Sequence, residues 1–240
     1  MSKILTDRNK RILVISDLHI PYEHPDSLTF LKALKKEIDP TRVVSLGDEL
    51  DKHALSYHDN NPDLPSAGDE LKLSIDRLQP YYKLFPRIDV VESNHGSMIY
   101  RKALTHGLPK AYVRDYNDVL GAPKGWVWHE NLMLQYKDNA PIFITHGMSA
   151  NVMKVVEQYG MNVIQGHYHS TFSIGYMSNP THLLWGLQGG CMVDQKSLAF
   201  AYSKLFRKRF IIGCSAIIEG QPVLYPMILD KDGRWIGKLV

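Results

Sequence analysis

The sequence predicts an α/β fold, because short apolar runs alternate with segments of helical periodicity over the first two thirds of its 240 residues. The last third is rich in β-forming segments bounded by turns, so an antiparallel contribution is expected there. Hydrophobic residues make up 44% and charged residues 22% of the chain, which excludes disordered, collagen-like and coiled-coil classes. Because no repeat or linker interrupts the chain, we expect a single domain over residues 1–240.

The first 48 residues predict a strand, a helix and a second strand. Residues 11–16 form a continuous apolar run, typical of a buried strand. Apolar residues at helical spacing follow a helix-start pattern at residues 25–27, and Asp39 followed by Pro40 ends that helix. Residues 42–46 form the second apolar run, and this order of elements favours a parallel pair of strands.

A long loop, a helix and a strand are expected next. Residues 53–68 are polar and contain two prolines, and a loop of this length in a compact domain is often functional. Leu71, Ile75 and Leu78 lie at helical spacing, so we expect a helix that ends at Pro80. Residues 88–92 are the next expected strand.

The second half of the chain predicts mainly strands. Residues 126–128 and 132–136 flank Glu130 and Asn131, which predicts a β-hairpin. A strand, a short helix and another strand are expected after it, at 142–145, 152–159 with Gly160 as its C-cap, and 162–165. Five more strands are expected at 171–177, 182–188, 210–219, 223–229 and 234–239.

Residues that can bind metals follow five of these expected strands. In α/β sheets, functional sites lie beyond the carboxyl ends of the strands, so these five strand ends can converge. They offer seven nitrogen and oxygen ligands, too many for one tetrahedral ion but suited to two octahedral ions that share a carboxylate. The seven candidates are Asp17, His19, Asp48, Asn94, His146, His167 and His169.

Taken in order, these motifs resemble those of the calcineurin-like metallophosphoesterases. The order is Asp-x-His, Gly-Asp-x-x-Asp, Asn-His, His and Gly-His-x-His, and it spans residues 17–169. The chain looks similar to phage-encoded and bacterial members, which include deoxyribonucleoside 5′-monophosphatases. The resemblance implies a sandwich of two mixed β-sheets flanked by helices.

The resemblance also implies a role for each candidate ligand. Asp48 would bridge two ions, and the other six would divide into two sets of three. One set would be Asp17, His19 and His169, and the other Asn94, His146 and His167. We expect two divalent ions per chain, manganese first, with magnesium, cobalt, iron, zinc or nickel as alternatives.

A two-metal hydrolysis of a phosphoester is the implied reaction. Two cations clamp a phosphate and lower the pKa of a bridging water, and the resulting hydroxide attacks phosphorus in line. The resemblance makes His95 the catalytic histidine, kept cationic near neutral pH by pairing with Asp51. His95 would then stabilise the developing charge or protonate the leaving oxygen.

Three residues depart from the family's usual pattern. Ser93 stands where a glycine is common, which removes backbone freedom, and Gly96 stands where an acidic residue is common. Lys52 follows the second aspartate of Gly-Asp-x-x-Asp, where protein phosphatases carry arginine. Because lysine binds phosphate as a point charge and not as a bidentate fork, a protein phosphatase is disfavoured.

The ligands indicate the reaction but not the ester. A phosphomonoesterase acting on nucleoside or deoxynucleoside 5′-monophosphates is the leading hypothesis, by analogy with family members. A phosphodiesterase or nuclease is the alternative, and a basic groove around Arg207, Lys208 and Arg209 would support it. A non-catalytic scaffold is the remote alternative, and the intact motifs argue against it. The candidate substrate-binding residues are Lys52, His53, His58 and Tyr168, with Tyr57 beside them.

Composition also limits the setting in which the protein works. Cys191 and Cys214 are too few for a disulfide framework, which favours a reducing compartment. No apolar run is long enough to cross a membrane and the start resembles no signal peptide, so we expect a cytoplasmic protein with no membrane partner. The net charge of +3 permits a small phosphate ester as partner and does not demand nucleic acid. A homodimer or higher homo-oligomer is the default expectation.

Overall fold

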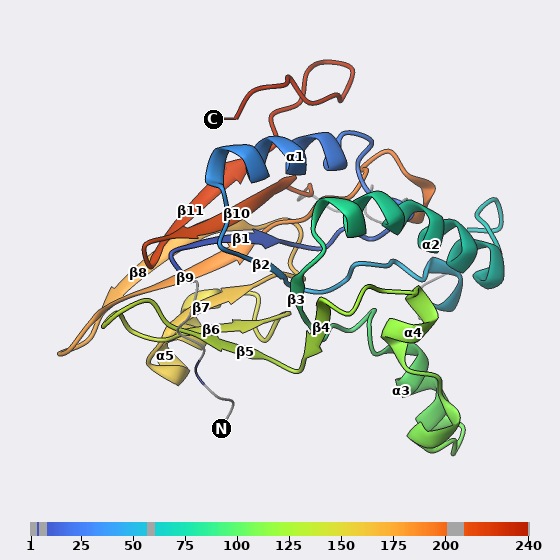
Figure 1. Cartoon of the computed structure of the whole chain (residues 1–240), viewed down its shortest axis with the longest axis horizontal. Helices are drawn as coiled ribbons and strands as arrows, with labels where there is room; N and C mark the ends of the chain where they lie inside the picture. The colour runs from blue at the N-terminus through green and yellow to red at the C-terminus, as the bar shows by residue number, and fades with distance from the viewer. Residues whose placement is uncertain (1–3, 5–8, 57–60, 201–208, 240) are drawn as a thin grey trace.

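The computed structural model describes residues 4, 9–56, 61–200 and 209–239, and two mixed β-sheets form its centre (Figure 1). In the six-stranded sheet, β1, β2, β3 and β4 run parallel to one another, β10 pairs antiparallel with β1, and β11 pairs antiparallel with β10 at the edge. The parallel pairing predicted for the first two strands is therefore confirmed. In spatial order the strands are β11 (Gln221–Pro226), β10 (Gly213–Ile218), β1 (Arg11–Ile15), β2 (Arg42–Ser45), β3 (Ile88–Val91) and β4 (Trp126–His129).

The second sheet has five strands. Its three inner strands are parallel, and its two edge strands pair antiparallel with their neighbours. In spatial order they are β5 (Leu132–Leu134), β6 (Ile142–Thr145), β7 (Asn162–Gln165), β9 (Leu183–Gly189) and β8 (Phe172–Ser178).

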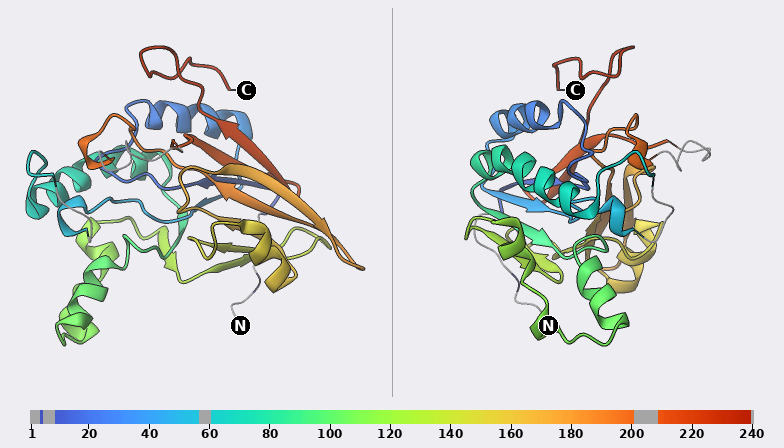
Figure 2. Two further views of the ribbon diagram at one scale, coloured as in Figure 1. Left: turned by 180° about the vertical axis from the view of Figure 1, so that it is seen from behind. Right: turned by 90° about the vertical axis from the view of Figure 1, so that its right-hand side faces the viewer.

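The two sheets pack face to face around a buried apolar core. Val14 and Val44 from the first sheet belong to the same buried cluster as Ile144, Ile164 and Leu187 from the second. Helices α1 (Ser27–Ile38) and α2 (Ala67–Leu84) cover the outer face of the six-stranded sheet, and α5 (Val152–Tyr159) covers the other sheet (Figures 1 and 2). The predicted fold class, two mixed sheets flanked by helices, is confirmed.

Helix α2 does not end at Pro80 as predicted but continues to Leu84. Proline lacks the N–H that would bond to the carbonyl of Asp76 one turn earlier. Both residues lie on the exposed side of the helix, where water can satisfy that carbonyl. Tyr81 and Tyr82 lie directly after the proline and are buried against the sheet, which holds the last turn in place.

The predicted hairpin around Glu130 and Asn131 is wrong. Strand β4 pairs with β3 in the first sheet, whereas β5 pairs with β6 in the second, so the chain changes sheets at this point. The change of sheet is explained by where the apolar side chains of the two strands are buried. Trp126 packs under α2, and Leu134 is buried between the sheets. A hairpin would have kept both on one sheet.

The chain after β11 does not form the strand predicted at 234–239, and one isolated bridge joins Leu229 to Trp235. The segment crosses α1 instead (Figure 1). The Arg234 guanidinium donates two hydrogen bonds to the Asp26 carboxylate, and the Trp235 ring packs edge-on against Phe30, with 5.3 Å between centroids.

Residues 96–120 project from the body of the molecule as a separate lobe, which the sequence did not predict (Figures 1 and 2). The lobe holds α3 (Met98–Thr105), a 3-10 turn η2 (Lys110–Tyr112) and α4 (Tyr116–Leu120). A further 3-10 turn, η1 (His53–Leu55), follows the second strand. No helix in the described part of the chain is long and apolar enough to span a membrane.

Candidate metal centre

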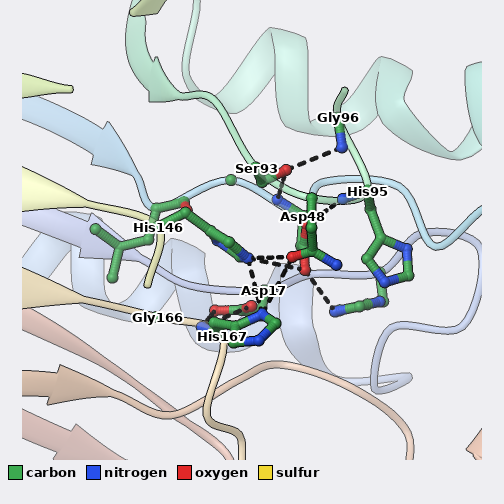
Figure 3. A network of polar contacts seen from close by, with 12 residues as sticks. Asp17, Asp48, Ser93, His95, Gly96, His146, Gly166 and His167 are labelled. Atoms are coloured by element: carbon green, nitrogen blue, oxygen red, sulfur yellow. Dashed lines mark hydrogen bonds and ion pairs between the residues drawn. The ribbon is translucent and has the colours of Figure 1, made fainter. Parts of the chain in front are cut away.

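The carboxyl ends of strands from both sheets meet at one place, as expected (Figure 3). Asp17 and His19 follow β1, Asp48 follows β2, and Asn94 follows β3, all from the six-stranded sheet. The other sheet contributes residues after β6 and β7, namely His146, His167 and His169. The structure therefore brings all seven predicted metal ligands together, whereas their roles as ligands stay predictions.

The first group of candidate ligands is Asp17, His19 and His169, whose ligand atoms all lie within 4.8 Å of one another. Nε2 of His169 is 3.3 Å from Oδ1 of Asp17. The rings of His19 and His169 meet edge-on, with 4.9 Å between centroids. These are the three residues assigned to one ion in the sequence analysis.

The second group is Asp48, His146 and His167, again within 4.8 Å of one another. The amide oxygen of Asn94 lies between the two imidazoles, 2.6 Å from Nε2 of His146 and 3.1 Å from Nδ1 of His167. The other ring nitrogen of His146 donates to the carbonyl of Leu46 at 2.7 Å, which turns Nε2 towards the cluster.

Asp48 lies between the two groups. Its Oδ2 is 3.3 Å from Nε2 of His146 and 3.5 Å from Nε2 of His19. A carboxylate in this position can bind an ion on each side, which is the bridging role that the resemblance implies. His95 also comes within 4.8 Å of His19 and Asp48, so a third ligand combination is possible by distance.

Four of the site residues have left-handed backbone conformations. Their φ angles are 46° for Asp17, 51° for His19, 49° for Asp48 and 68° for His167. Such conformations are uncommon outside glycine and cluster at functional sites, where the surrounding structure sustains the strain. The tight reversal after each strand places these side chains at the sheet ends, away from the core.

Two glycines let the strand ends approach one another. A side chain at Gly166 would clash with the carboxylate of Asp17, and one at Gly47, whose φ is 93°, would clash with Ser93. Because Gly166 has no Cβ, the backbone N–H of the next residue, His167, comes within 3.1 Å of Oδ1 of Asp17 and donates to it. This hydrogen bond links the Asp17 carboxylate, after β1 of the first sheet, to the backbone after β7 of the second sheet.

Ser93, which the sequence analysis noted only as a departure from the family's pattern, joins two turns of the candidate site. Its hydroxyl oxygen accepts hydrogen bonds from the backbone N–H of Asp48 at 2.9 Å and of Gly96 at 3.0 Å (Figure 3). These bonds join the turn after β2 to the turn after β3. A serine directly after a strand, three residues before a glycine, is a turn pattern that could have indicated this role.

Asp51 contacts His95 as predicted, but through its main-chain carbonyl and not through its carboxylate. Oδ1 of Asp51 accepts a hydrogen bond from Nδ1 of His19 at 2.6 Å, whereas Nδ1 of His95 donates to the main-chain carbonyl of Asp51. The cause is an isolated parallel bridge between Ile20 and Leu50, which lays the chain around Asp51 alongside His19. Asp51 therefore orients a candidate metal ligand with its carboxylate and His95 with its backbone.

Replacement of Asp51 by asparagine is expected to weaken metal binding about 10- to 100-fold, because the imidazole of His19 loses the carboxylate that fixes its orientation. Metal affinity measured by competition with a chromophoric chelator checks this result. Asp63→Asn, at an exposed position, is the matched control. An unchanged affinity in Asp51→Asn would remove Asp51 from the metal centre.

Opposite charges hold the metal-free cluster together. Burial opposes ionisation of Asp48, yet the neighbouring His146 and His95 keep the pKa of this carboxyl well below its usual range. Burial likewise opposes the protonation of His146, but the Asp48 charge outweighs it and raises the pKa of His146 to about 9. The pKa of Asp17 is lowered against burial by His169, and that of His19 is raised against burial by Asp51.

His95 and His167 behave differently. Burial lowers the pKa of His95, and burial with the neighbouring His146 lowers the pKa of His167. In the metal-free protein, burial outweighs the attraction of Asp48 and Asp51, which would raise the pKa of His95. The cationic form expected from pairing with Asp51 is therefore not the one that this environment favours.

Metal binding is expected to release protons at neutral pH. His146 carries a proton below about pH 9 in the metal-free protein, and a metal ion needs its neutral ring. The apparent affinity for Mn²⁺ should therefore rise as the pH increases towards 9 and level off above it. Calorimetric titrations in buffers of different ionisation enthalpy count the released protons. Binding without proton release at pH 7 would contradict this electrostatic description.

The residues fit a bound divalent cation. Nε2 of His19 is buried and has no hydrogen-bond partner, and it points towards Asp48. An orphaned buried nitrogen is costly, and a metal ion would satisfy it. The carboxylate, amide and imidazole donors are those that manganese, iron, zinc and cobalt accept. The cluster therefore has the composition and the geometry of a metal-binding site.

The predicted substrate-binding residues lie in different settings. Lys52 is buried, and its ammonium donates to the carbonyls of His95 and Gly96 and lies 3.9 Å from the centre of the Tyr116 ring. His53 is also buried, and its Nε2 accepts from the backbone N–H of Asn61. Both side chains are therefore buried and already form hydrogen bonds with the protein backbone.

Tyr168 is half-buried and meets the ring of His167 edge-on, with 4.9 Å between centroids. It therefore lies at the edge of the metal centre, and its role in binding substrate stays a prediction. Tyr57 and His58 lie outside the described residues, as do Arg207 and Lys208 of the basic run. Arg209 is described and exposed.

Comparisons with known proteins give no family by sequence. No family model matches the chain, and no curated protein matches it. Among solved structures, Vacuolar Protein Sorting 29 from Cryptosporidium parvum is similar with a TM-score of 0.49 and 14% identity, covering 98% of this chain and 96% of that one. Vps29 from Chaetomium thermophilum follows with a TM-score of 0.47 and 12% identity, covering 98% and 95%.

YfcE, a phosphoesterase from E. coli, is similar with a TM-score of 0.45 and 12% identity, covering 96% of this chain and 98% of that one. All three scores lie below 0.5. The fold of this chain is therefore defined by its own two sheets and three covering helices, and its candidate function by its own side chains.

Proposed function

We propose that this protein is a phosphoester hydrolase that uses two divalent metal ions and acts on nucleoside or deoxynucleoside 5′-monophosphates. One observation carries the hydrolase proposal. Six metal-capable side chains from the ends of four strands in two sheets cluster around the carboxylate of Asp48 at the end of a fifth strand, and Figure 3 shows part of this cluster. The preference for nucleotides rests on the motif resemblance described for residues 17–169.

The ligand groups define where the ester would bind. When bound, two divalent cations would supply charge neutralisation at the phosphoryl oxygens and lower the pKa of a water molecule. Asp17, His19 and His169 would hold one cation, and Asn94, His146 and His167 the other. Asp48 would hold both. The left-handed turns and Gly166 fix these groups in advance, so little reorganisation is needed when the ester binds.

His95 would move the proton in the reaction. Nδ1 of His95 carries hydrogen because it donates to the Asp51 carbonyl, so in the neutral ring Nε2 is a proton acceptor. A lowered pKa keeps that acceptor free near neutral pH. We propose that Nε2 takes up a proton from solvent and gives it to the leaving oxygen as the bond to phosphorus breaks. The ring lies 4.8 Å from that of His19, next to the candidate ligands.

A matched substrate comparison tests the proposal. The Mn²⁺-loaded protein is incubated with nucleoside and deoxynucleoside 5′-monophosphates, with bis-p-nitrophenyl phosphate and with single-stranded DNA. Release of phosphate from the monophosphates alone supports the proposed function. Cleavage of the diesters alone would replace it with a phosphodiesterase or nuclease. Absence of hydrolysis with every substrate and every metal tried would overturn the enzyme proposal.

A further inference from the structure

A cavity of about 940 Å³ lies beside the metal centre, between the projecting lobe and the body of the molecule. Helix α2 and strand β4 form the wall on the body side, and α3 and α4 form the wall on the lobe side. Figure 1 shows the lobe beside β4 and the end of α2. None of the seven candidate metal ligands lines this cavity, so it is a separate feature from the cluster described above.

Several aromatic side chains line this cavity. The rings of Tyr116 and Trp128 have centroids 5.9 Å apart, and those of Trp128 and Trp126 lie 6.1 Å apart. All three residues line the cavity, together with Tyr100. Aromatic surfaces of this kind bind flat rings by stacking.

Large aliphatic side chains are also left partly uncovered there. Val127 in β4 is 46% exposed and Ile99 in α3 is 40% exposed, and both line the cavity. A bound organic group would remove this apolar surface from water. The volume lies within the range of about 300–1,000 Å³ that is usual for small-molecule sites.

The cavity extends to the residues next to His95 and Asp51. Gly96 and Lys52 line it, and each directly follows one of these two residues in the chain. Consecutive Cα atoms are about 3.8 Å apart, so the cavity wall comes within one residue of the proposed proton carrier. The Lys52 ammonium joins the two sides, since it contacts the carbonyls of His95 and Gly96 and the ring of Tyr116.

We propose that this cavity binds a planar aromatic group carried by the alcohol portion of the substrate, an inference that rests on the proposed phosphoester hydrolase. Charged groups of both signs line it, which suits the donors and acceptors on the edge of a heteroaromatic ring such as a nucleobase. A long polyanion would require an excess of basic groups. Four basic residues line the cavity, namely Lys52, Lys110, Arg114 and Lys124. Four acidic residues line it as well, namely Glu70, Glu92, Asp115 and Glu130.

Binding of nucleosides to the metal-free protein tests this inference without any reaction. Adenosine and thymidine carry the aromatic group but no phosphate, and ribose serves as the comparison ligand. We expect saturable quenching of tryptophan fluorescence and saturation-transfer NMR signals with both nucleosides, and neither with ribose. Absence of saturable nucleoside binding would overturn the inference, whether or not the enzyme hydrolyses phosphoesters.

A cavity-filling variant locates the binding. Val127→Phe adds bulk inside the cavity at an exposed position, and Leu183→Phe is the matched control, at a residue that is 64% exposed and does not line the cavity. Val127→Phe should weaken adenosine binding at least tenfold, whereas Leu183→Phe should leave it unchanged. Equal affinities in the two variants would overturn the assignment to this cavity.

The same variants separate this inference from the proposed function. With active protein, Val127→Phe should lower kcat/KM for deoxynucleoside 5′-monophosphates at least tenfold and leave glycerol 2-phosphate unaffected. An equal loss with both substrates would overturn the role of the cavity while hydrolysis stands. If adenosine binds in the cavity but no ester is hydrolysed, the proposed function fails and the nucleoside site remains.

Discussion

Replacement of Asp48 by alanine is expected to abolish metal binding at both positions and to lower hydrolysis by more than about 10³-fold. Asp48 is the carboxylate that lies between His19 and His146, so its loss removes a ligand from each proposed ion at once. The candidate ligands that remain are four imidazoles, the carboxylate of Asp17 and the amide of Asn94. A set dominated by imidazoles competes poorly for manganese, which prefers oxygen ligands.

Metal content after gel filtration, measured by inductively coupled plasma mass spectrometry, checks this prediction. Asp138→Ala, at an exposed turn, is the control for the loss of a carboxylate. Circular dichroism establishes that the Asp48→Ala protein is folded. Two bound ions per folded chain in Asp48→Ala would refute the bridging role.

Replacement of His95 by asparagine is expected to lower kcat by about 10² to 10⁴ while both metal ions stay bound. That range is the usual contribution of a positioned proton donor or acceptor. His95 is held by its Nδ1–H on the Asp51 carbonyl and is not among the seven proposed ligands. The prediction therefore separates proton transfer from metal binding.

Parallel measurements of kcat and metal content decide between these roles. His182→Asn, at an exposed histidine, is the matched control. Loss of one ion in His95→Asn would make His95 a ligand, as its distance from His19 and Asp48 allows. Normal kcat with both ions bound would exclude it from the reaction.

The sequence predicted the strands and the convergence of their ends because both follow from local patterns. Buried parallel strands appear as continuous apolar runs, and the polar residue after each run lies at the sheet edge. All seven candidate ligands were found in this way. The change of sheet between Trp126 and Leu134 could not be predicted. Strand β4 pairs with β3, which is distant in the sequence, and β5 pairs with the strand that follows it, so the local pattern at Glu130 and Asn131 does not show which sheet each strand joins.

The errors at the site have a similar origin. The partner of Asp51 depends on how the loop after β2 lies against the turn after β1, and no spacing within one motif reports that contact. The helices α3 and α4 are short and mostly exposed, so their apolar periodicity is weak. For the same reason the cavity beneath them could not be anticipated, although its aromatic residues are visible in the sequence.

The central claim is that two divalent cations bind on either side of Asp48. Crystals grown with Mn²⁺ and measured above the manganese absorption edge test it most directly. Two anomalous peaks are expected to flank the Asp48 carboxylate, one beside Asp17, His19 and His169 and the other beside Asn94, His146 and His167. No peak at these residues, or a single peak that leaves Asp48 unliganded, would contradict it.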